Sequence, residues 1–135
     1  MRADLACAAS LAEAAAVTLT PDPWWPVAVL AVIVLGDGLM TFRPPRAIAA
    51  CLDGVGLPRD WWWVLAVVKF LAVAGLLAGF WVPGVGLAAV IGLVVYFLAA
   101  AWAHIRVRYV GRDFWLNCLG MLTGVVLVLV FCFLV

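Results

Sequence analysis

The sequence predicts an all-α membrane protein in which four transmembrane helices form an antiparallel bundle. Hydrophobic residues make up 70% of the 135-residue chain and charged residues only 11%, which is more apolar surface than a soluble domain of this size can bury. Four apolar runs are also long enough, at about 1.5 Å of rise per residue, to cross a hydrocarbon core roughly 30 Å thick. The expected spans are about 24–42, 61–81, 86–103 and 114–135, within a single domain of residues 24–135.

An Ala-rich tail, residues 1–23, precedes the first span. Two acidic residues interrupt it, so it does not match the apolar core of a signal peptide. A capping-box pattern that begins at Ser10 predicts a short helix over about residues 10–20, and the two prolines that follow would end it. We expect this tail to be frayed or to lie on the surface.

Two opposite charges lie inside consecutive spans. Asp37 stands between two glycines in the first span, and Lys69 lies in the second. A charge at the centre of a span costs roughly 2.5–3.5 kcal/mol, so it usually faces protein and has a partner. Consecutive antiparallel helices tend to be neighbours, and the flexible lysine stem can reach towards the interface. We therefore expect an Asp37–Lys69 ion pair; in the alternative, each side chain reaches water separately.

Small residues indicate which helix faces approach one another. We expect two such faces to point into the bundle: on the third span Ala89, Gly92, Leu93, Tyr96, Ala99, Ala100 and Ala103, and on the fourth Asn117, Gly120, Met121 and Gly124. On the second span, Gly75 and Gly79 form a GxxxG pattern. We interpret this pattern as a contact surface for a neighbouring helix or for a second copy of the chain, in which case the protein would be a homo-oligomer.

Polar side chains gather in one half of the predicted bundle, near the Arg-rich loops, and they are the candidate binding residues: Lys69, Asp37, Tyr96, His104 and Asn117. Ionisable groups inside a membrane often mark a substrate, ion or proton site. In the alternative, they only hold the helices in register. The single histidine and four cysteines without a CxxC do not favour a metal site, and no nucleophile–base pair is visible. We therefore expect no catalytic residues, no metal and no enzymatic activity of the chain on its own.

The arginines predict the orientation of the chain in the membrane. The loops on one side carry three each: Arg43, Arg46 and Arg59, then Arg106, Arg108 and Arg112. The opposite side carries only Arg2, so the positive-inside rule places both basic loops in the cytoplasm and both termini outside. We expect the loop arginines to set the topology and to contact anionic lipid headgroups. The formal net charge of +1 gives no reason to expect a nucleic-acid partner.

Several segments occur in an order that resembles a known family. They are Arg43-Pro44-Pro45, then residues 56–62 (GLPRDWW), then residues 68–107, where Lys69 is followed by a Gly-rich helix, a proline turn and His-x-Arg. Over about residues 24–135 the chain resembles the DoxX-like family of small bacterial membrane proteins. The resemblance implies a compact four-helix bundle in the bacterial plasma membrane. Some relatives are named as subunits of thiosulfate:quinone oxidoreductase and others are linked to thiol and oxidative-stress systems, which implies a redox-associated role.

The sequence leaves competing functions open. The first is an accessory or scaffold subunit, linked to membrane redox or thiol-stress systems, with a membrane or cytoplasmic protein partner. The second is binding of a quinone or lipid-like small molecule in a polar pocket in the cytoplasmic half of the bundle. A permease is less favoured, because four spans are few and no inverted repeat is visible. We expect no intrinsic cofactor; a quinone is implied only by the family resemblance.

A fused reporter tests the predicted orientation. A reporter that is active only in the cytoplasm should be silent when fused after Val135, because the C-terminus is expected outside. The measurement is reporter activity in intact cells, with expression of the fusion checked by immunoblotting. An active fusion would overturn the orientation.

Overall fold

The computed structural model describes residues 1–14, 18–112 and 114–134, and within them all regular secondary structure is helical. Its elements are α1 (Arg2–Ala14), α2 (Trp25–Phe42), α3 (Arg46–Gly54), the 3-10 turn η1 (Arg59–Trp61), α4 (Trp62–Ala78), α5 (Val85–Arg106), the π-helical turn η2 (Phe114–Leu119), α6 (Gly120–Leu129) and the π-helical turn η3 (Val130–Leu134). In this part of the chain four helical segments are long and apolar enough to cross a membrane: Trp25–Phe42, Arg59–Ala78, Val85–Arg106 and Phe114–Leu134. The predicted fold class is confirmed.

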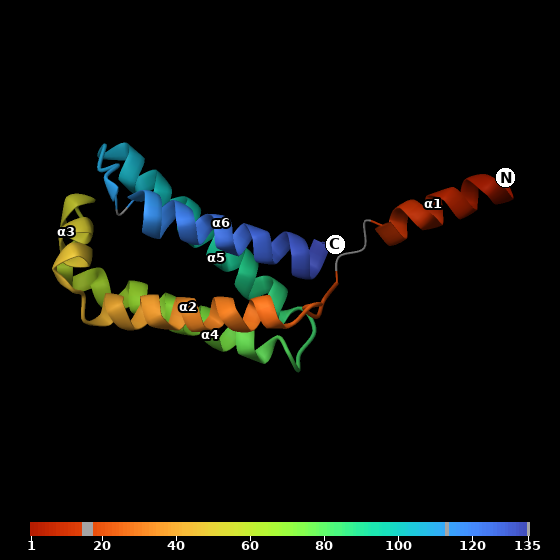
Figure 1. Ribbon diagram of the computed structural model, residues 1–135, viewed down its shortest axis with the longest axis horizontal. Coiled ribbons are helices and arrows are strands. Elements are labelled where there is room, and N and C mark those ends of the chain that lie inside the picture. Colours follow the sequence, from red (N-terminus) through yellow and green to blue (C-terminus); the bar gives the residue numbers. More distant parts are fainter. Residues whose placement is uncertain (15–17, 113, 135) are drawn as a thin grey trace.

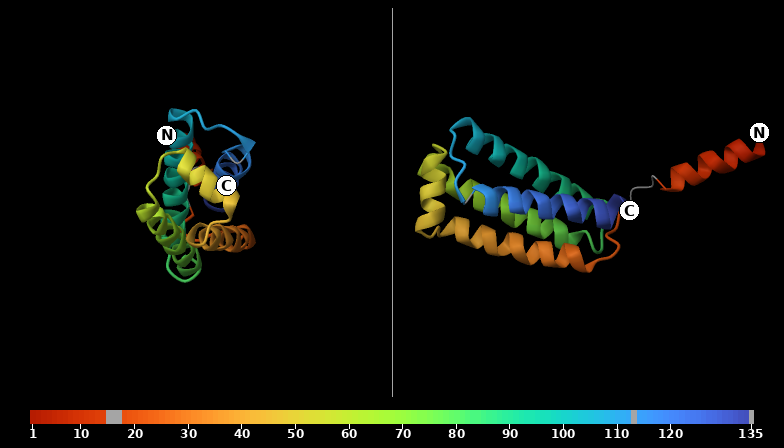
Figure 2. Two further views of the ribbon diagram at one scale, coloured as in Figure 1. Left: turned by 90° about the vertical axis from the view of Figure 1, so that its left-hand side faces the viewer. Right: turned by 45° about the horizontal axis from the view of Figure 1, so that its top comes forward.

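The four spans close into a bundle in which each helix contacts two others. α2 contacts α4, α4 contacts α5, α5 contacts α6, and α6 contacts α2. The short helix α3 runs across one end of the bundle (Figure 1). We call this the basic end, because the loops at 43–59 and 106–112 hold the arginines there. The opposite end, with the turn between α4 and α5 and the chain's last residues, is the turn end (Figure 2).

Proline and glycine decide where the spans stop. α2 ends at Phe42, just before Arg43 and two prolines, which disfavour the helical conformation of the preceding residue and lack an N–H donor. α4 ends at Ala78, three residues before the predicted end of the second span, and the chain turns back through Pro83-Gly84. Gly84 has a φ of 88°, a left-handed conformation that glycine adopts without a steric cost.

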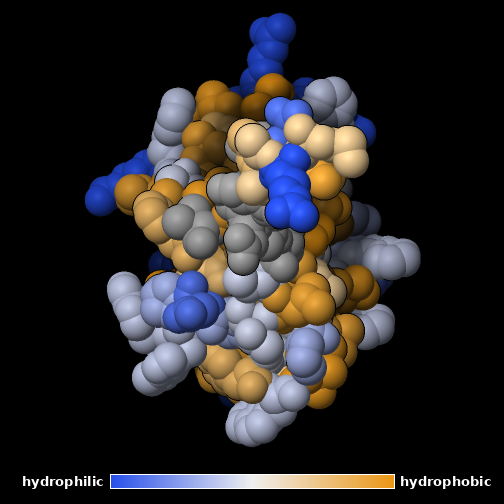
Figure 3. Space-filling view, turned by 90° about the vertical axis from the view of Figure 1, so that its right-hand side faces the viewer, coloured by the Kyte–Doolittle hydropathy of each residue, from blue (hydrophilic) through white to orange (hydrophobic). Residues whose placement is uncertain are grey.

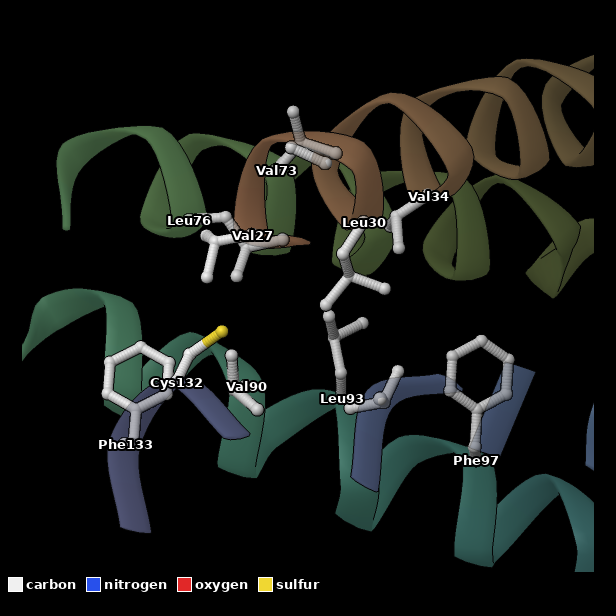
Figure 4. Close-up of a cluster of buried hydrophobic side chains, with 12 residues drawn as sticks. Val27, Leu30, Val34, Val73, Leu76, Val90, Leu93, Phe97, Cys132 and Phe133 are labelled. Atoms are coloured by element: carbon white, nitrogen blue, oxygen red, sulfur yellow. The ribbon is translucent and has the colours of Figure 1, made fainter. Parts of the chain in front are cut away.

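A cluster of large apolar side chains fills the bundle. One buried cluster unites Val27, Leu30 and Val34 of α2, Val73 and Leu76 of α4, Val90, Leu93 and Phe97 of α5, and Cys132 and Phe133 of η3 (Figure 4). All of these residues are buried. Burial gains little hydrophobic free energy when the alternative solvent is lipid, so close van der Waals contact holds these helices together.

The outer surface suits a bilayer. Large apolar side chains are exposed along every span, and the exposed tryptophans lie near both ends: Trp24, Trp25 and Trp81 at the turn end, and Trp61, Trp63, Trp102 and Trp115 at the basic end. Tryptophan prefers the water–lipid interface, where its amphipathic ring meets both media. Seen from the turn end, the surface is mostly hydrophobic or weakly polar, with few strongly hydrophilic side chains (Figure 3).

The N-terminal tail differs from its prediction. The helix expected over residues 10–20 is instead α1, which begins at Arg2, so Ser10 lies inside it rather than capping it. Alanine is the strongest helix former, and the Ala-rich run is helical from its start. Residues 15–17 of the predicted helix lie outside the described residues. α1 stands apart from the bundle (Figure 1), and its side chains at positions 2–8 are exposed.

Residues between Thr18 and Asp22 form hydrogen bonds with the last helical turn, η3. The backbone N–H groups of Thr18 and Asp22 donate to the carbonyl oxygens of Phe133 and Cys132, at 2.9 and 3.1 Å. The Thr18 hydroxyl also donates to the Cys132 carbonyl, at 3.1 Å. The last carbonyls of a helix have no partner within the helix, so this segment satisfies groups that the bilayer could not.

Mostly larger side chains face the core from the third and fourth spans, although Gly86 and Ala101 of α5 are buried as well. The buried residues include Val90, Leu93, Phe97, Ala101 and His104 on α5, and Phe114, Cys118, Val125, Cys132 and Phe133 on the last span. Gly92, Ala99, Asn117 and Gly120 are exposed. The prediction that the small-residue faces point into the bundle was therefore wrong for Gly92, Ala99 and Gly120, whereas Asn117, although exposed, borders a cavity between the helices. Larger side chains fill the core more completely, and small residues such as Gly92 and Ala99 lie beside recesses of the surface.

The GxxxG pattern is a contact within the chain. A Cβ atom added to Gly75 would lie 2.9 Å from the Cβ of Ala89, and one added to Gly79 would overlap the backbone of Gly86. The two glycines thus let α4 and α5 approach closely near the turn end. Of the two predicted uses of this surface, the neighbouring helix occupies it.

Gly79→Ala should destabilise the bundle, because the added methyl group forces α4 and α5 apart. We expect a loss of about 1–3 kcal/mol, typical of overpacking. The control is Gly124→Ala, whose added Cβ has no atom within 4 Å. Thermal unfolding of the purified proteins should show a lower midpoint for Gly79→Ala alone. Equal midpoints for the two variants would contradict the close approach.

Candidate functional site

The predicted ion pair is present between the first two spans. The Lys69 Nζ on α4 lies 2.8 Å from the Asp37 Oδ2 on α2, and the two side chains are only 8% and 25% exposed. A charged hydrogen bond of this length is strong. The alternative in which each charge reaches water on its own is excluded.

Two further groups complete the surroundings of the Lys69 ammonium. It donates to the Thr41 Oγ1 at 2.8 Å, and that hydroxyl donates to the Asp37 carbonyl at 2.9 Å. The ammonium also lies 5.7 Å from the centre of the Tyr96 ring, within the range of a cation–π contact. Sequence reasoning missed Thr41, although it lies four residues after Asp37 and therefore on the same helix face.

His104 is buried near the end of α5, with 7% of its surface exposed. Its Nε2 lies 3.3 Å from the Sγ of Cys51 on α3, and its ring lies against Phe114 and Tyr109, with centroids 5.4 and 6.1 Å away. Its Nδ1 is buried and has no hydrogen-bond partner among the described residues. Such an atom costs about 1–3 kcal/mol, and in native proteins a water molecule or a ligand usually satisfies it.

A small cavity of about 100 Å³, which we call the inner cavity, adjoins these groups. Its lining includes all five candidate residues predicted from the sequence: Asp37, Lys69, Tyr96, His104 and Asn117. Asn117 is otherwise exposed. The fold thus brings the five candidates to one place; their role in binding stays a prediction.

Two cysteines also line the inner cavity. Cys51 comes from α3 and Cys118 from η2, where its thiol donates to the Phe97 carbonyl at 3.7 Å. The sequence showed only scattered cysteines without a CxxC, and nothing in their spacing signals that they share a cavity. Across the described ranges, no group of three His, Cys, Asp or Glu side chains is placed to hold a metal ion.

A larger recess of about 510 Å³, the outer hollow, lies beside the inner cavity, and the two share Leu52, Tyr96, Ala100 and His104. α4 and α5 diverge towards the basic end (Figures 1 and 2). Three alanines of α5 (Ala99, Ala100 and Ala103) line the recess and Leu65 of α4 borders it. The divergence of the helices and the small side chains together leave the space open.

The six loop arginines lie where the sequence predicted them. Arg43, Arg46, Arg59, Arg106, Arg108 and Arg112 are all exposed at the basic end. Arg59 pairs with Asp53 at 3.2 Å, and its guanidinium lies 5.4 Å from the Trp62 ring centre. Arg106 also borders the outer hollow. Contact of these side chains with lipid headgroups stays a prediction.

Together these features define a multi-pass integral membrane protein whose polar side chains converge near one end of an apolar bundle. A model of the DoxX-like family matches residues 26–133. The chain belongs to the DoxX-like family. No curated protein and no solved structure matches the chain.

A double-mutant cycle measures the ion pair. Lys69→Met leaves the Asp37 carboxylate without its cation, and we expect a loss of about 3–5 kcal/mol, as for other half-broken buried pairs. The double variant Asp37→Asn/Lys69→Met should recover much of this loss, because no buried charge remains. Unfolding of the purified proteins in one detergent gives the comparison. If the two single effects simply add, the charges are not coupled.

Proposed function

We propose that this protein binds an amphipathic small molecule, of the quinone or lipid-like type, whose polar head reaches His104. One observation carries the proposal: the unpartnered, buried Nδ1 of His104 belongs to a side chain that borders both the inner cavity and the outer hollow. The site lacks one hydrogen bond that a ligand head could make. The outer hollow has room for such a head, and its lining is mostly apolar, as in most ligand pockets.

The histidine can serve either form of a quinone. If the Cys51 thiol donates to Nε2, then Nδ1 carries the proton and can donate to a quinone carbonyl. If instead Nε2–H donates to the sulfur, Nδ1 is an acceptor and suits a quinol hydroxyl. The 2.8 Å contact between Asp37 and Lys69 pairs the two charges at the inner cavity. This arrangement favours an uncharged group at the inner cavity.

The positions of the loop arginines support an orientation of the protein in the membrane. The basic end faces the cytoplasm of a bacterial cell, with both termini outside, and the protein resides in the plasma membrane. The ligand head then lies in the cytoplasmic half of the bilayer. The exposed tryptophans near the basic end, Trp61, Trp102 and Trp115 among them, support an interface at that level.

A second function, an accessory subunit of a redox-associated membrane assembly, is supported by α1. This 13-residue helix stands away from the bundle (Figure 1), and isolated helices of that length are marginal in water. A partner protein or the bilayer surface would stabilise it. Native mass spectrometry of gently extracted protein separates the two functions: a bound small molecule supports the first, and a stoichiometric protein partner without a ligand supports the second.

Substitutions at position 104 test the head site. His104→Asn keeps a polar group near the position of Nδ1, whereas His104→Gln keeps one near Nε2 and the Cys51 contact. We expect His104→Gln to weaken binding of a short-chain benzoquinone about tenfold, the equivalent of one hydrogen bond of about 1.4 kcal/mol. His104→Asn should retain most of the affinity. Isothermal titration of the detergent-solubilised proteins gives the dissociation constants.

The proposal fails if wild-type protein does not bind the benzoquinone, or if both variants bind as tightly as wild type. Thermal unfolding of each variant checks that the bundle is intact. A variant that unfolds early is replaced by His104→Phe, which keeps an aromatic ring and removes both nitrogens.

A further inference from the structure

We infer that the hydrocarbon chain of the same ligand lies in a groove between α4 and α5, so that the ligand is a single-chain amphiphile aligned with the helices. The groove has a volume of about 310 Å³, and Leu71 and Gly75 of α4 and Ala89, Gly92 and Tyr96 of α5 are among its lining residues. Tyr96 is the one lining residue that carries a polar side-chain group. This inference rests on the proposed head site and names the part of the ligand that the head site leaves open.

The groove and the outer hollow meet at Tyr96, which borders both. From Tyr96 the outer hollow continues along α5 past Ala99 and Ala103 to His104, and the groove continues the other way to Val85. The two recesses therefore follow α5 from Val85 to Arg106, roughly 30 Å at the rise of an α-helix. That length equals the hydrocarbon thickness of a typical bilayer, so a chain anchored at His104 would run along the membrane normal.

A regular stripe of residues on α5 lines the two recesses. On α5 the lining residues recur every three or four positions, at Val85, Ala89, Gly92, Tyr96, Ala99 and Ala103. This stripe is largely the small-residue face that the sequence had predicted to point into the bundle. A stripe of small residues alone does not indicate a ligand; the unpartnered Nδ1 of His104 at one end of the path supplies that indication.

Gly92 keeps the groove open at its middle. A Cβ added there would have no atom within 4 Å, whereas a Cβ added to Gly75 of α4 would lie 2.9 Å from the Cβ of Ala89. The helices touch at Gly75 and leave space at Gly92. A larger side chain at position 92 would fill the groove without disturbing the contact between the helices.

The groove orients the chain more than it raises affinity. A hydrocarbon chain in the bilayer is already in an apolar medium, so its transfer into the groove gains little hydrophobic free energy. The decisive measurement is therefore the position of the bound ligand's hydrocarbon chain and not the dissociation constant.

Photo-crosslinking of the 135-residue protein in lipid nanodiscs tests the inference. The probe is a benzoquinone with a long alkyl chain that carries a diazirine near its far end. Mass spectrometry of the labelled peptides should place most of the label on the groove residues of α4 and α5. Excess short-chain benzoquinone should displace it. Gly92→Leu should reduce groove labelling several-fold, while Gly124→Leu, equally free of neighbours within 4 Å and outside the three recesses, should not.

The outcomes separate the two proposals. Label spread evenly over the lipid-facing residues of α2 and α6, with the short-chain quinone still bound, overturns the chain groove and leaves the head site. Absence of short-chain binding overturns the head site and, with it, the groove assignment. A Gly92→Leu protein that changes from dimer to monomer, measured by light scattering, would assign the groove to a second copy and also overturn the inference.

Discussion

The buried ammonium of Lys69 is the constraint on which the arrangement of the bundle depends. A bilayer offers no water to solvate a charge, so the cation has to find its partners inside the protein. It finds them on two other helices: Asp37 and Thr41 on α2 and the Tyr96 ring on α5. Apolar contacts between membrane helices tolerate sliding and rotation, whereas this set of contacts holds only in one register. The ion pair thus fixes how α2, α4 and α5 are aligned.

The two ends of the bundle are built differently. At the turn end, Gly75 and Gly79 bring α4 against α5, Phe133 fills the interior of the bundle, and the segment that begins at Thr18 donates hydrogen bonds to the carbonyls of Cys132 and Phe133. Towards the basic end the same two helices diverge, alanines replace larger side chains, and α3 crosses the opening. The two recesses that His104 borders lie where the helices separate, and the polar side chains lie beside them.

The contrast between Lys69 and His104 distinguishes a structural group from an incomplete one. Lys69 is satisfied by an anion, a hydroxyl and an aromatic ring, so its contacts account for its presence without a ligand. His104 is equally buried, but one ring nitrogen lacks a partner among the described residues. The sequence drew attention to the ion pair. This difference places the centre of the proposed site at the histidine instead. Tyr96 connects the two, because it faces the Lys69 ammonium and borders all three recesses.

The sequence by itself determined the spans, the ion pair and the half of the bundle in which polar groups gather. Length, hydropathy and a charge that must be compensated are local or nearly local properties, and even Thr41 was accessible from its spacing to Asp37. Only the tertiary structure decided which face of each helix is buried, because that depends on how volumes on four helices fit together: the core took Phe97 and Phe133, and the face around Gly92 came to border a groove. The same holds for the contact of Cys51 with His104 and for the unpartnered Nδ1. Cys51 and His104 lie more than fifty positions apart, and no spacing rule in the sequence predicts such a contact.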